Sequence, residues 1–350
     1  MYKLFSAISV FLLLLSTTTL NVEAQLKGKY PPVDTPPPPV AAWTALVDQS
    51  KLPKAPVRPI GTPCAPTDEF CVWSCTTCVR DTDFGFCPKK GDWALTYDDG
   101  PTNNTLRVLK ALNDRGLKAT FFVIGSRVFE NPQILKQIVD SGHQIGVHTW
   151  SHTALTSQTT EEIIAETKWT EMAIKEAVNL TPKWFRAPQG DADDRVRGIL
   201  SQLGYKMAFW NHDTFDWESN SDPTYDLNWI TGNFSMWVQN TTATTGFASL
   251  EHDAFDKSSS KAEAAMDIVV NAKFAPQSAA VCSGDKQPYV ENVTLPPSNI
   301  KGQETTAKTP NAPNGKSSST PPAISASGAS SVEKNLLLGI VCGLIMMILV

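Results

Sequence analysis

Between about residues 91 and 283, short apolar runs typical of buried strands alternate with longer segments whose apolar residues recur at helical spacing. The expected strands are Trp93–Tyr97, Ala119–Ile124, His143–His148, Trp184–Arg186, Lys206–Trp210 and Phe247–Glu251. Helices are expected between them, and the longest should begin at a capping box made by Thr159 and Glu162. Repeated strand–helix units predict a parallel sheet or barrel. In such folds, functional residues gather where the strands end.

Unusual polar residues stand at five of these predicted strand ends. The stretches are 98-DDG-100, 148-HTWSH-152, 186-RAPQGD-191, 213-DTFDW-217 and 249-SLEHD-253. Taken alone, each has a plain interpretation: a solvated turn for DDG, surface residues for the two histidines, a surface ion pair for Arg186 and a core histidine for His252. His143 and His212 have no partner pattern, and we expect them to be structural.

Two histidines and a carboxylate among these residues suit a catalytic metal. His148 and His152 offer neutral imidazole, the commonest metal ligand among side chains, and Asp99 offers a carboxylate. Such a set leaves one coordination position open for water. Neighbouring side chains on a strand point to opposite faces. We therefore expect Asp98 to point elsewhere, to pair with Arg186 and to act as a base toward the water.

The cysteines indicate an exported protein with disulfides. Six of the seven lie outside the apolar C-terminal tail: Cys64, Cys71, Cys75, Cys78, Cys87 and Cys282. An even number in a secreted chain predicts three disulfides, with the pairing left open. If all six pair, Cys282 must reach back to one of the other five. The alternative for 75-CTTC-78 alone is a zinc knuckle or a redox motif.

Both ends of the chain have the composition of targeting segments. Residues 1–24 read as a signal peptide, with an uncleaved anchor helix as the alternative. At the other end, small residues, a polar spacer and a terminal apolar run form a GPI-attachment pattern, with Ser327 or Gly328 as the expected attachment residue. The alternative there is a tail-anchored helix. We predict a secreted protein that is GPI-anchored to the plasma membrane, the cell wall or both.

These signals divide the chain into six segments. They are a signal peptide (1–24), a proline-rich extended leader (25–61), a cysteine-rich cap (62–90), a core domain (91–283), a disordered Ser/Thr/Pro-rich stalk (284–331) and a GPI-attachment tail (332–350). N-glycosylation sequons occur at Asn103, Asn179, Asn233, Asn240 and Asn292. The formal net charge of −5 gives no support for a nucleic-acid partner. Separately, we expect the protein to be a monomer.

Together the five motifs resemble those of the polysaccharide deacetylases with the NodB-type domain, specifically the secreted fungal chitin deacetylases. The matching stretches are 96-TYDDGP-101, 148-HTWSH-152, 186-RAPQG-190, 213-DTFDW-217 and 250-LEH-252, in order across roughly residues 91–275. The resemblance implies a distorted (β/α) barrel with fewer than eight strands, here behind a disulfide-rich cap. It also implies hydrolysis of N-acetyl groups of chitin, which gives chitosan and acetate.

The resemblance also assigns roles, position by position. Asp99, His148 and His152 would hold one divalent metal, normally zinc, with cobalt as the alternative. Asp98 would be the general base, oriented by Arg186. The backbone N–H near Gln189 would help to hold the oxyanion, and Trp217 and Leu250 would wall the pocket for the acetyl methyl. His252 would be the general acid, tuned by Asp216.

The chain departs from the family pattern at two positions. Tyr97 replaces a commoner phenylalanine, and Gln189 stands where many members have an aromatic residue, which bears on how substrate packs there. A glycan at Asn103 would also sit close to the active-site loop. Two alternatives stay open: a deacetylase of another acetylated polysaccharide, acetylxylan or peptidoglycan, and a non-catalytic chitin-binding wall protein.

Overall fold

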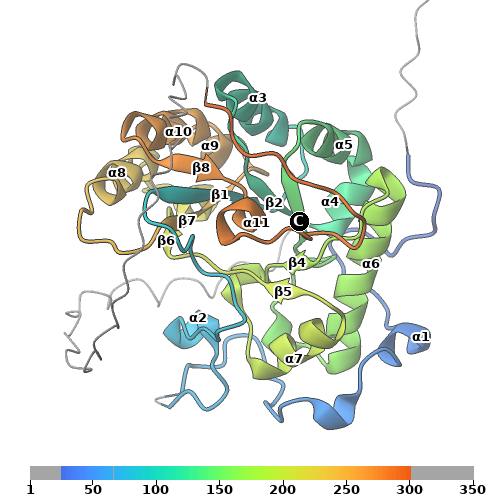
Figure 1. Cartoon of the computed structure of the whole chain (residues 1–350). Coiled ribbons are helices and arrows are strands. Elements are labelled where there is room, and N and C mark those ends of the chain that lie inside the picture. Colours follow the sequence, from blue (N-terminus) through green and yellow to red (C-terminus); the bar gives the residue numbers. More distant parts are fainter. Residues whose placement is uncertain (1–24, 66, 301–350) are drawn as a thin grey trace, which may run out of the picture.

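The computed structural model describes residues 25–65 and 67–300 (Figure 1). The predicted signal peptide (1–24), the GPI-attachment tail (332–350) with Ser327 and Gly328, and the predicted stalk beyond residue 300 lie outside the described residues. Within the described part, no helix is long and apolar enough to cross a membrane.

A parallel sheet forms the centre of the molecule. Its strands are β1 (Asp92–Asp98), β2 (Thr120–Val123), β3 (Gln144–Val147), β4 (Trp184–Phe185), β5 (Lys206–Met207), β6 (His212–Asp213), β7 (Phe247–His252) and β8 (Ala275–Gln277). Seven of them follow the order β5-β4-β3-β2-β1-β7-β6, and β8 pairs with the start of β1 beside this path. The seven-stranded path confirms the predicted distorted barrel. The short strands β6 and β8 were not predicted.

The two ends of the strand path are close in sequence. Residues 208–211 connect β5 directly to β6. The Ala208 N–H donates to the Phe185 carbonyl of β4 at 2.8 Å, and the Asn211 N–H donates to the Ala248 carbonyl of β7 at 3.1 Å. A single segment, 206–213, therefore borders both β4 and β7 and brings the two edges of the curved sheet together.

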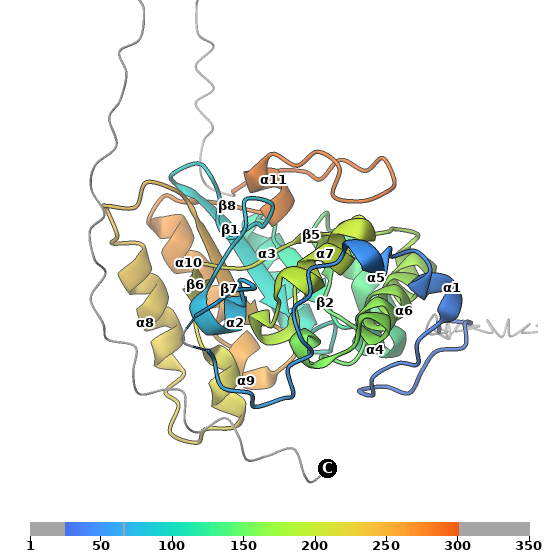
Figure 2. The ribbon, with the colours of Figure 1, turned by 90° about the horizontal axis from the view of Figure 1, so that it is seen from below.

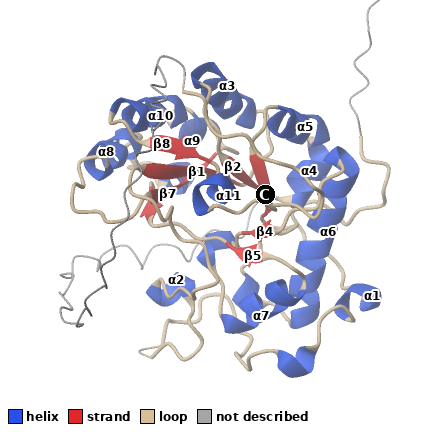
Figure 3. Cartoon of the chain, viewed as in Figure 1, coloured by secondary structure: helices blue, strands red, loops and turns tan. Residues whose placement is uncertain are grey.

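Helices surround the sheet (Figures 2 and 3). They are α3 (Thr105–Arg115), α4 (Gly125–Glu130), α5 (Pro132–Asp140), α6 (Thr160–Val178), α7 (Asp194–Gln202), α8 (Asn228–Trp237), α9 (Asp256–Ser259), α10 (Ala262–Asn271) and α11 (Ala279–Ser283), with short α1 (Ala41–Thr44) and α2 (Trp73–Thr76) before the sheet. The predicted capping box of α6 is present, because the Thr159 and Glu162 side chains each bond the backbone of the other. The main apolar core fills the space between sheet and helices.

A smaller apolar cluster fills the inside of the curved sheet. It includes Ala94, Phe122, Trp184, Ala208 and Ala248, all buried. Side chains alternate along a strand, so Asp98 lies on the same face of β1 as Ala94, and His252 lies on the same face of β7 as Ala248. The register pairs Asp98 with His252 across these two strands. Two of the predicted functional residues thus emerge side by side at one end of the sheet.

The proline-rich leader packs against the folded core. The Tyr30 ring stacks on Trp150, with centroids 5.7 Å apart and planes 3° apart. Trp43 meets Trp169 edge-on at 5.0 Å. The leader therefore packs on the side of the molecule formed by α4 and α6. Its prolines predicted an extended conformation but not this packing.

Three disulfides join the six cysteines, as predicted. The pairs are Cys64–Cys75, Cys71–Cys78 and Cys87–Cys282. The third joins residues 195 positions apart, so Cys282 does reach back to the cap. Because Cys75 and Cys78 each pair with another cysteine, the alternative of a zinc knuckle or redox pair is wrong.

The folded region continues past residue 283, into the segment predicted to be a disordered stalk. The Tyr289 hydroxyl accepts the Ile145 N–H at 2.9 Å, and Glu291 pairs with Lys175 at 2.6 Å. Leu295 and Ile300 pack against the core. These contacts are made by isolated residues among prolines and polar residues. The composition of the segment therefore does not predict them.

Candidate active site

Asp98 ends β1 inside the sheet and is held by Arg186. The Arg186 Nη1 donates to Asp98 Oδ1 at 2.8 Å and to Thr96 Oγ1 at 2.8 Å. The guanidinium, fully buried, lies over the Phe122 ring at 4.1 Å. The other Asp98 oxygen, Oδ2, is 3.7 Å from His148 Nε2. The arginine therefore fixes one oxygen of the carboxylate and leaves the other facing the two histidines.

Asp99 turns away from its neighbour because the backbone changes direction after β1. Its φ of 79° lies in the left-handed region, which few non-glycine residues adopt. A Cβ on Gly100 would lie 2.4 Å from Asp253 Oδ2, so only glycine fits at that position. Asp253 also accepts the Gly100 N–H at 3.1 Å. This turn places the adjacent carboxylates of Asp98 and Asp99 in different surroundings. It therefore reduces the repulsion expected between the two like charges of the DDG sequence.

Asp99, His148 and His152 come together as a group that could hold a metal ion, with their ligand atoms within 4.8 Å of one another. Asp99 Oδ1 lies 3.4 Å from His148 Nε2 and 3.2 Å from His152 Nε2. This oxygen is buried and has no hydrogen-bond partner within the described chain. An unpaired buried carboxylate oxygen facing two imidazole nitrogens is the arrangement that a bound cation would satisfy.

The protonation of the three side chains also fits a cation. His148 Nδ1 lies 2.8 Å from the Arg186 carbonyl, so it carries the proton and leaves Nε2 free. Burial lowers the pKa of His152 despite the attraction of Asp99. Burial would raise the pKa of Asp99, but His152 and His148 hold it well below its usual range. Metal ligands must be deprotonated, and the lowered pKa values of His152 and Asp99 agree with that requirement.

Glu166, which the sequence did not single out, holds the loop between the two histidines. It is a buried residue of α6. Its Oε2 accepts the N–H groups of Trp150 at 2.7 Å and Ser151 at 2.9 Å, and its Oε1 accepts the Ser151 hydroxyl at 2.5 Å. The available signal was an acidic residue on the otherwise apolar face of a helix.

We expect Glu166→Ala to weaken the binding of a divalent cation by about 10–100-fold, the usual cost of losing a partner that orients metal ligands. Glu166→Gln keeps one acceptor for the two N–H groups and should recover most of the affinity. Competition with a chromophoric chelator measures the effect with Zn²⁺. Glu161→Ala is the matched control, because Glu161 lies on the same helix and bonds Gln49 instead. Unchanged affinity in Glu166→Ala, with its fold intact, would contradict this role.

His252 is the last residue of β7 and is held by two hydrogen bonds to Asp216. His252 Nδ1 lies 2.6 Å from Asp216 Oδ1, and Asp216 Oδ2 accepts the His252 N–H at 2.8 Å. Burial opposes the charged imidazole, but the attraction of Asp216, together with Asp99 and Asp98, raises the pKa of His252 to about 10. His252 is therefore protonated at neutral pH and can donate from Nε2, the nitrogen that Asp216 leaves free.

The remaining predicted site residues lie close in sequence to the residues described above. Leu250 is buried on β7, two residues before His252. Trp217 follows Asp216 in a 3₁₀ turn (Asp216–Asn220) and is 45% exposed, so it can meet a substrate only from the solvent side. Gln189 is exposed and left-handed, with φ 59°, in a 3₁₀ turn (Pro188–Gly190) after β4.

The sequons and the other histidines are not part of the ligand group. Asn103, Asn179, Asn240 and Asn292 are exposed, whereas the Asn233 amide nitrogen donates to the Thr214 carbonyl at 3.4 Å. A glycan on Asn233 would attach to this same nitrogen and leave it one N–H to donate. His143 accepts the Ala119 N–H at 3.2 Å, and His212 packs on Phe247.

Comparison with known proteins gives one family. Residues 86–208 match the family model described as Polysaccharide deacetylase. Chitin deacetylase 1 of Cryptococcus neoformans var. grubii is 40% identical over 257 residues, which cover 68% of this chain and 55% of that protein. Chitin deacetylase of Amylomyces rouxii is 36% identical over 234 residues, which cover 65% and 55%. The chain spans about half the length of the curated relatives it matches.

A solved structure has the same fold. The chitin deacetylase from the fungal pathogen Colletotrichum lindemuthianum aligns with a TM-score of 0.56 and 27% identity, over 60% of this chain and 96% of that one. The fold class predicted from the sequence is thus confirmed by an independent likeness as well as by the strand order.

Proposed function

Since the chain carries a polysaccharide deacetylase domain, we propose that it hydrolyses the N-acetyl groups of N-acetylglucosamine residues in chitin, giving chitosan and acetate. The observation that carries the proposal is Asp98, fixed by Arg186 at 2.8 Å with its free oxygen 3.7 Å from His148, beside a His252–Asp216 pair. The proposed base and acid thus lie on adjacent strands beside the metal-ligand group. The relatives named above supply the substrate class.

We propose that Asp99, His148 and His152 hold one divalent metal, zinc in the first place and cobalt as the alternative. Two histidines and a carboxylate are a common ligand set of catalytic zinc sites. When bound, the metal would act as a Lewis acid on the attacking water and on the acetyl oxygen.

Asp98 takes the proton of the attacking water in this proposal. Its Oδ2 is the oxygen that Arg186 leaves unbound, and it faces the ligand group. Water adds to the acetyl carbon, and the backbone N–H at Gln189 helps to hold the oxygen that becomes negative.

His252 completes the reaction by protonating the sugar nitrogen as the carbon–nitrogen bond breaks. An amine is a poor leaving group unless it receives a proton, and positioned acids typically contribute about 10²–10⁴-fold. Leu250 and Trp217 enclose the acetyl methyl. The bond that forms joins water oxygen to the acetyl carbon, so the products are acetate and a glucosamine residue.

We also propose that the protein acts outside the cell, at the plasma membrane or cell wall, as a GPI-anchored monomer. The three disulfides support an oxidising compartment. The anchor itself rests on the sequence pattern at the C-terminus.

Acetate release from an N-acetylglucosamine hexamer tests the proposal. We expect release by the metal-loaded protein, loss after treatment with a chelator, and recovery on addition of Zn²⁺ or Co²⁺. Acetylxylan and peptidoglycan are run beside the hexamer, and we expect them to release less acetate. Greater release from either polymer would overturn chitin as the substrate. No release from any of them by folded, metal-loaded protein would overturn the deacetylase proposal.

A further inference from the structure

The loop that carries the two proposed metal-ligating histidines has a conformation that its residues do not favour. Thr149, directly after His148, has a φ of 66°, and His152 has a φ of 61°. Both values lie in the left-handed region, where a β-branched residue such as threonine is rarely found. Such a conformation persists only when the surrounding structure enforces it. Contacts from outside the loop must therefore hold it in place.

Trp150, in the middle of this loop, is where such contacts converge. Its side chain is fully buried. The carbonyls of Thr149 and Trp150 accept the N–H groups of Gly125 and Ser126, the first residues of α4, at 2.8 and 3.2 Å. A Cβ on Gly125 would lie 2.7 Å from the Trp150 ring. Helix α4 therefore bonds the loop backbone and packs closely against the indole, while Glu166 of α6 bonds the loop from another element.

The proline-rich leader contacts the Trp150 side chain itself. The indole N–H donates to the Pro32 carbonyl at 3.0 Å, and the Tyr30 ring stacks on the indole with planes 3° apart. The Tyr30 ring also packs on Phe129 of α4, with ring centroids 5.3 Å apart. Buried polar groups need a hydrogen-bond partner. The leader thus satisfies the polar group of the indole and covers one of its faces.

Side chains at both ends of this short stretch tie it to the helices. The Tyr30 hydroxyl donates to Glu176 of α6 at 2.7 Å. The Asp34 carboxylate pairs with Arg127 of α4 at 3.0 Å. Figures 1 and 2 show the beginning of the leader, in blue, beside α6. The residues that contact Trp150 are therefore held between two fixed points.

The leader binds the domain in the manner of a proline-rich peptide. The Trp169 indole N–H donates to the Pro38 carbonyl at 3.2 Å, as the Trp150 indole does to Pro32. Proline has no N–H, so the carbonyls of a proline-rich segment remain free to accept bonds from other groups. Aromatic surfaces recognise proline-rich segments in this way. The prolines of the leader therefore suit it to dock on these two indoles.

We propose that the leader positions the two metal-ligating histidines by holding Trp150 in place. Tyr30 and Pro32 keep the indole between the leader and α4. The backbone on either side of the indole then keeps the left-handed residues that direct both imidazoles toward Asp99. The two leader residues act through Trp150, so they are positioning residues and not ligands. The proposal rests on the metal site proposed above, and it makes the leader a working part of the domain instead of a spacer.

The zinc affinity of the full chain tests the proposal, measured by competition with a chromophoric chelator. We expect Tyr30→Ala to weaken Zn²⁺ binding by about tenfold, the lower end of the range for partners that orient metal ligands. Tyr30→Phe keeps the ring stack and loses only the hydroxyl bond to Glu176, so it should retain the parent affinity. Tyr30 is partly exposed, which limits the damage that its truncation does to the core.

The matched control is Trp43→Ala, because Trp43 also anchors the leader on α6 but meets Trp169 instead of the ligand loop. Both alanine variants should lower Tm, whereas only Tyr30→Ala should lower the zinc affinity. Tyr30→Leu keeps apolar bulk without a stacking ring and should show the same loss. It takes the place of Tyr30→Ala if that variant does not fold.

Unchanged zinc affinity in the folded Tyr30 variants, or an equal loss in Trp43→Ala, would overturn the role of the leader. Weakened binding in Tyr30→Ala alone, in a protein whose parent form releases no acetate, would reject the proposed catalysis and keep this role. Acetate release by the parent, with unchanged zinc affinity in Tyr30→Ala, would reject this role alone. A parent protein that binds no zinc would reject the metal site and this role with it.

Discussion

Asp98→Asn is expected to lower kcat for acetate release by about 10²–10⁴-fold, because the amide cannot take a proton from the attacking water. The metal content should stay unchanged, since Asp98 is not among the three proposed ligands. Acetate release and metal content are measured on the same preparation. Asp92→Asn at the opposite end of β1 is the matched control, because the Asp92 carboxylate pairs with the exposed Lys89, at 3.8 Å, and not with a buried arginine.

The same substitution should also reduce stability. Arg186 is fully buried and would lose its charged partner. Breaking a buried pair typically costs about 3–5 kcal/mol. Activity must therefore be compared at a temperature where the variant is folded, as judged by its thermal unfolding. A folded, metal-loaded Asp98→Asn protein that keeps more than a tenth of the parent kcat would contradict the role of the base.

His252→Ala is the second large loss we expect, again about 10²–10⁴-fold in kcat with an amide substrate. The effect should shrink with an activated ester such as 4-nitrophenyl acetate, because its leaving group departs without needing a proton. Comparing the two substrates separates loss of the acid from general damage to the site. Equal losses on the amide and the ester would argue against proton donation by His252.

The pH dependence of kcat should follow His252 and its partner. Because Asp216 helps to raise the pKa of His252 to about 10, the acid form persists through neutral pH and activity should fall as the pH approaches that value. Asp216→Asn removes the attraction, so the alkaline fall should move to lower pH. Glu218→Gln, in the same 3₁₀ turn, should leave it in place.

The raised pKa of His252 also links pH to stability. The protonated pair contributes stability that is complete below the ordinary pKa of 6.5 and is lost as the pH rises toward about 10. Thermal unfolding across this range should show the loss, and Asp216→Asn should reduce it.

The sequence indicated which strand-end residues would come together more clearly than it indicated the edges of the sheet. Each functional motif follows an apolar run, and strand ends in a parallel fold meet at one edge, so Asp98, His148 and Arg186 could be expected to meet. The pairing of Asp98 with His252 depends on the register of β1 and β7, which no local pattern specifies. The strand β6 has two residues, too few to show periodicity.

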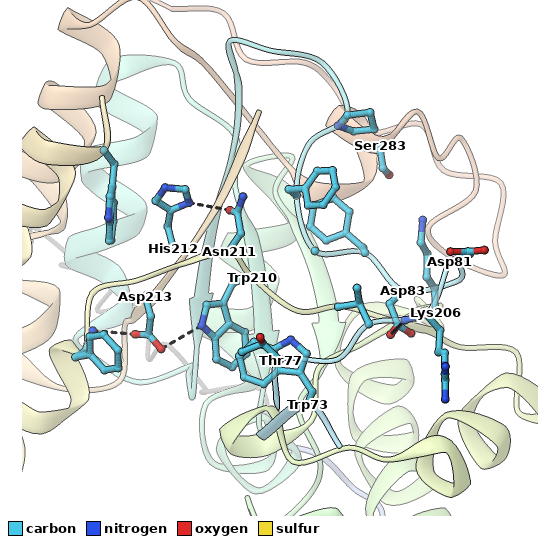
Figure 4. Close-up of a pocket in the computed structure, with 18 residues that line it drawn as sticks. Trp73, Thr77, Asp81, Asp83, Lys206, Trp210, Asn211, His212, Asp213 and Ser283 are labelled. Carbon is cyan, nitrogen blue, oxygen red and sulfur yellow. Dashed lines mark hydrogen bonds between the residues drawn. The ribbon is translucent and has the colours of Figure 1, made fainter. Parts of the chain in front are cut away.

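Other features escaped prediction because they depend on tertiary contact. In the sequence, Glu166 resembles the other acidic residues of its helix. Its role depends on the loop of Trp150 and Ser151, which folds onto it. Tyr289 is an isolated aromatic residue in a polar segment. Its structural role depends on one hydrogen bond to the backbone of β3. A groove of about 940 Å³ is lined mainly by residues of the cysteine-rich cap and of the segment that joins β5 to β6 (Figure 4). These two segments lie far apart in the sequence, so no local pattern predicts the groove.

The Cys87–Cys282 disulfide has a mechanical consequence if the protein is held by its C-terminal end, as proposed above. The proposed catalytic, metal-ligand and substrate residues all lie between these two cysteines. A pulling force that enters at residue 300 and leaves through the leader can cross from Cys282 to Cys87 through the covalent bond. Once the contacts of residues 284–300 and of the leader with the core have broken, the covalent bond carries the load past the enclosed segment, which contains the proposed site.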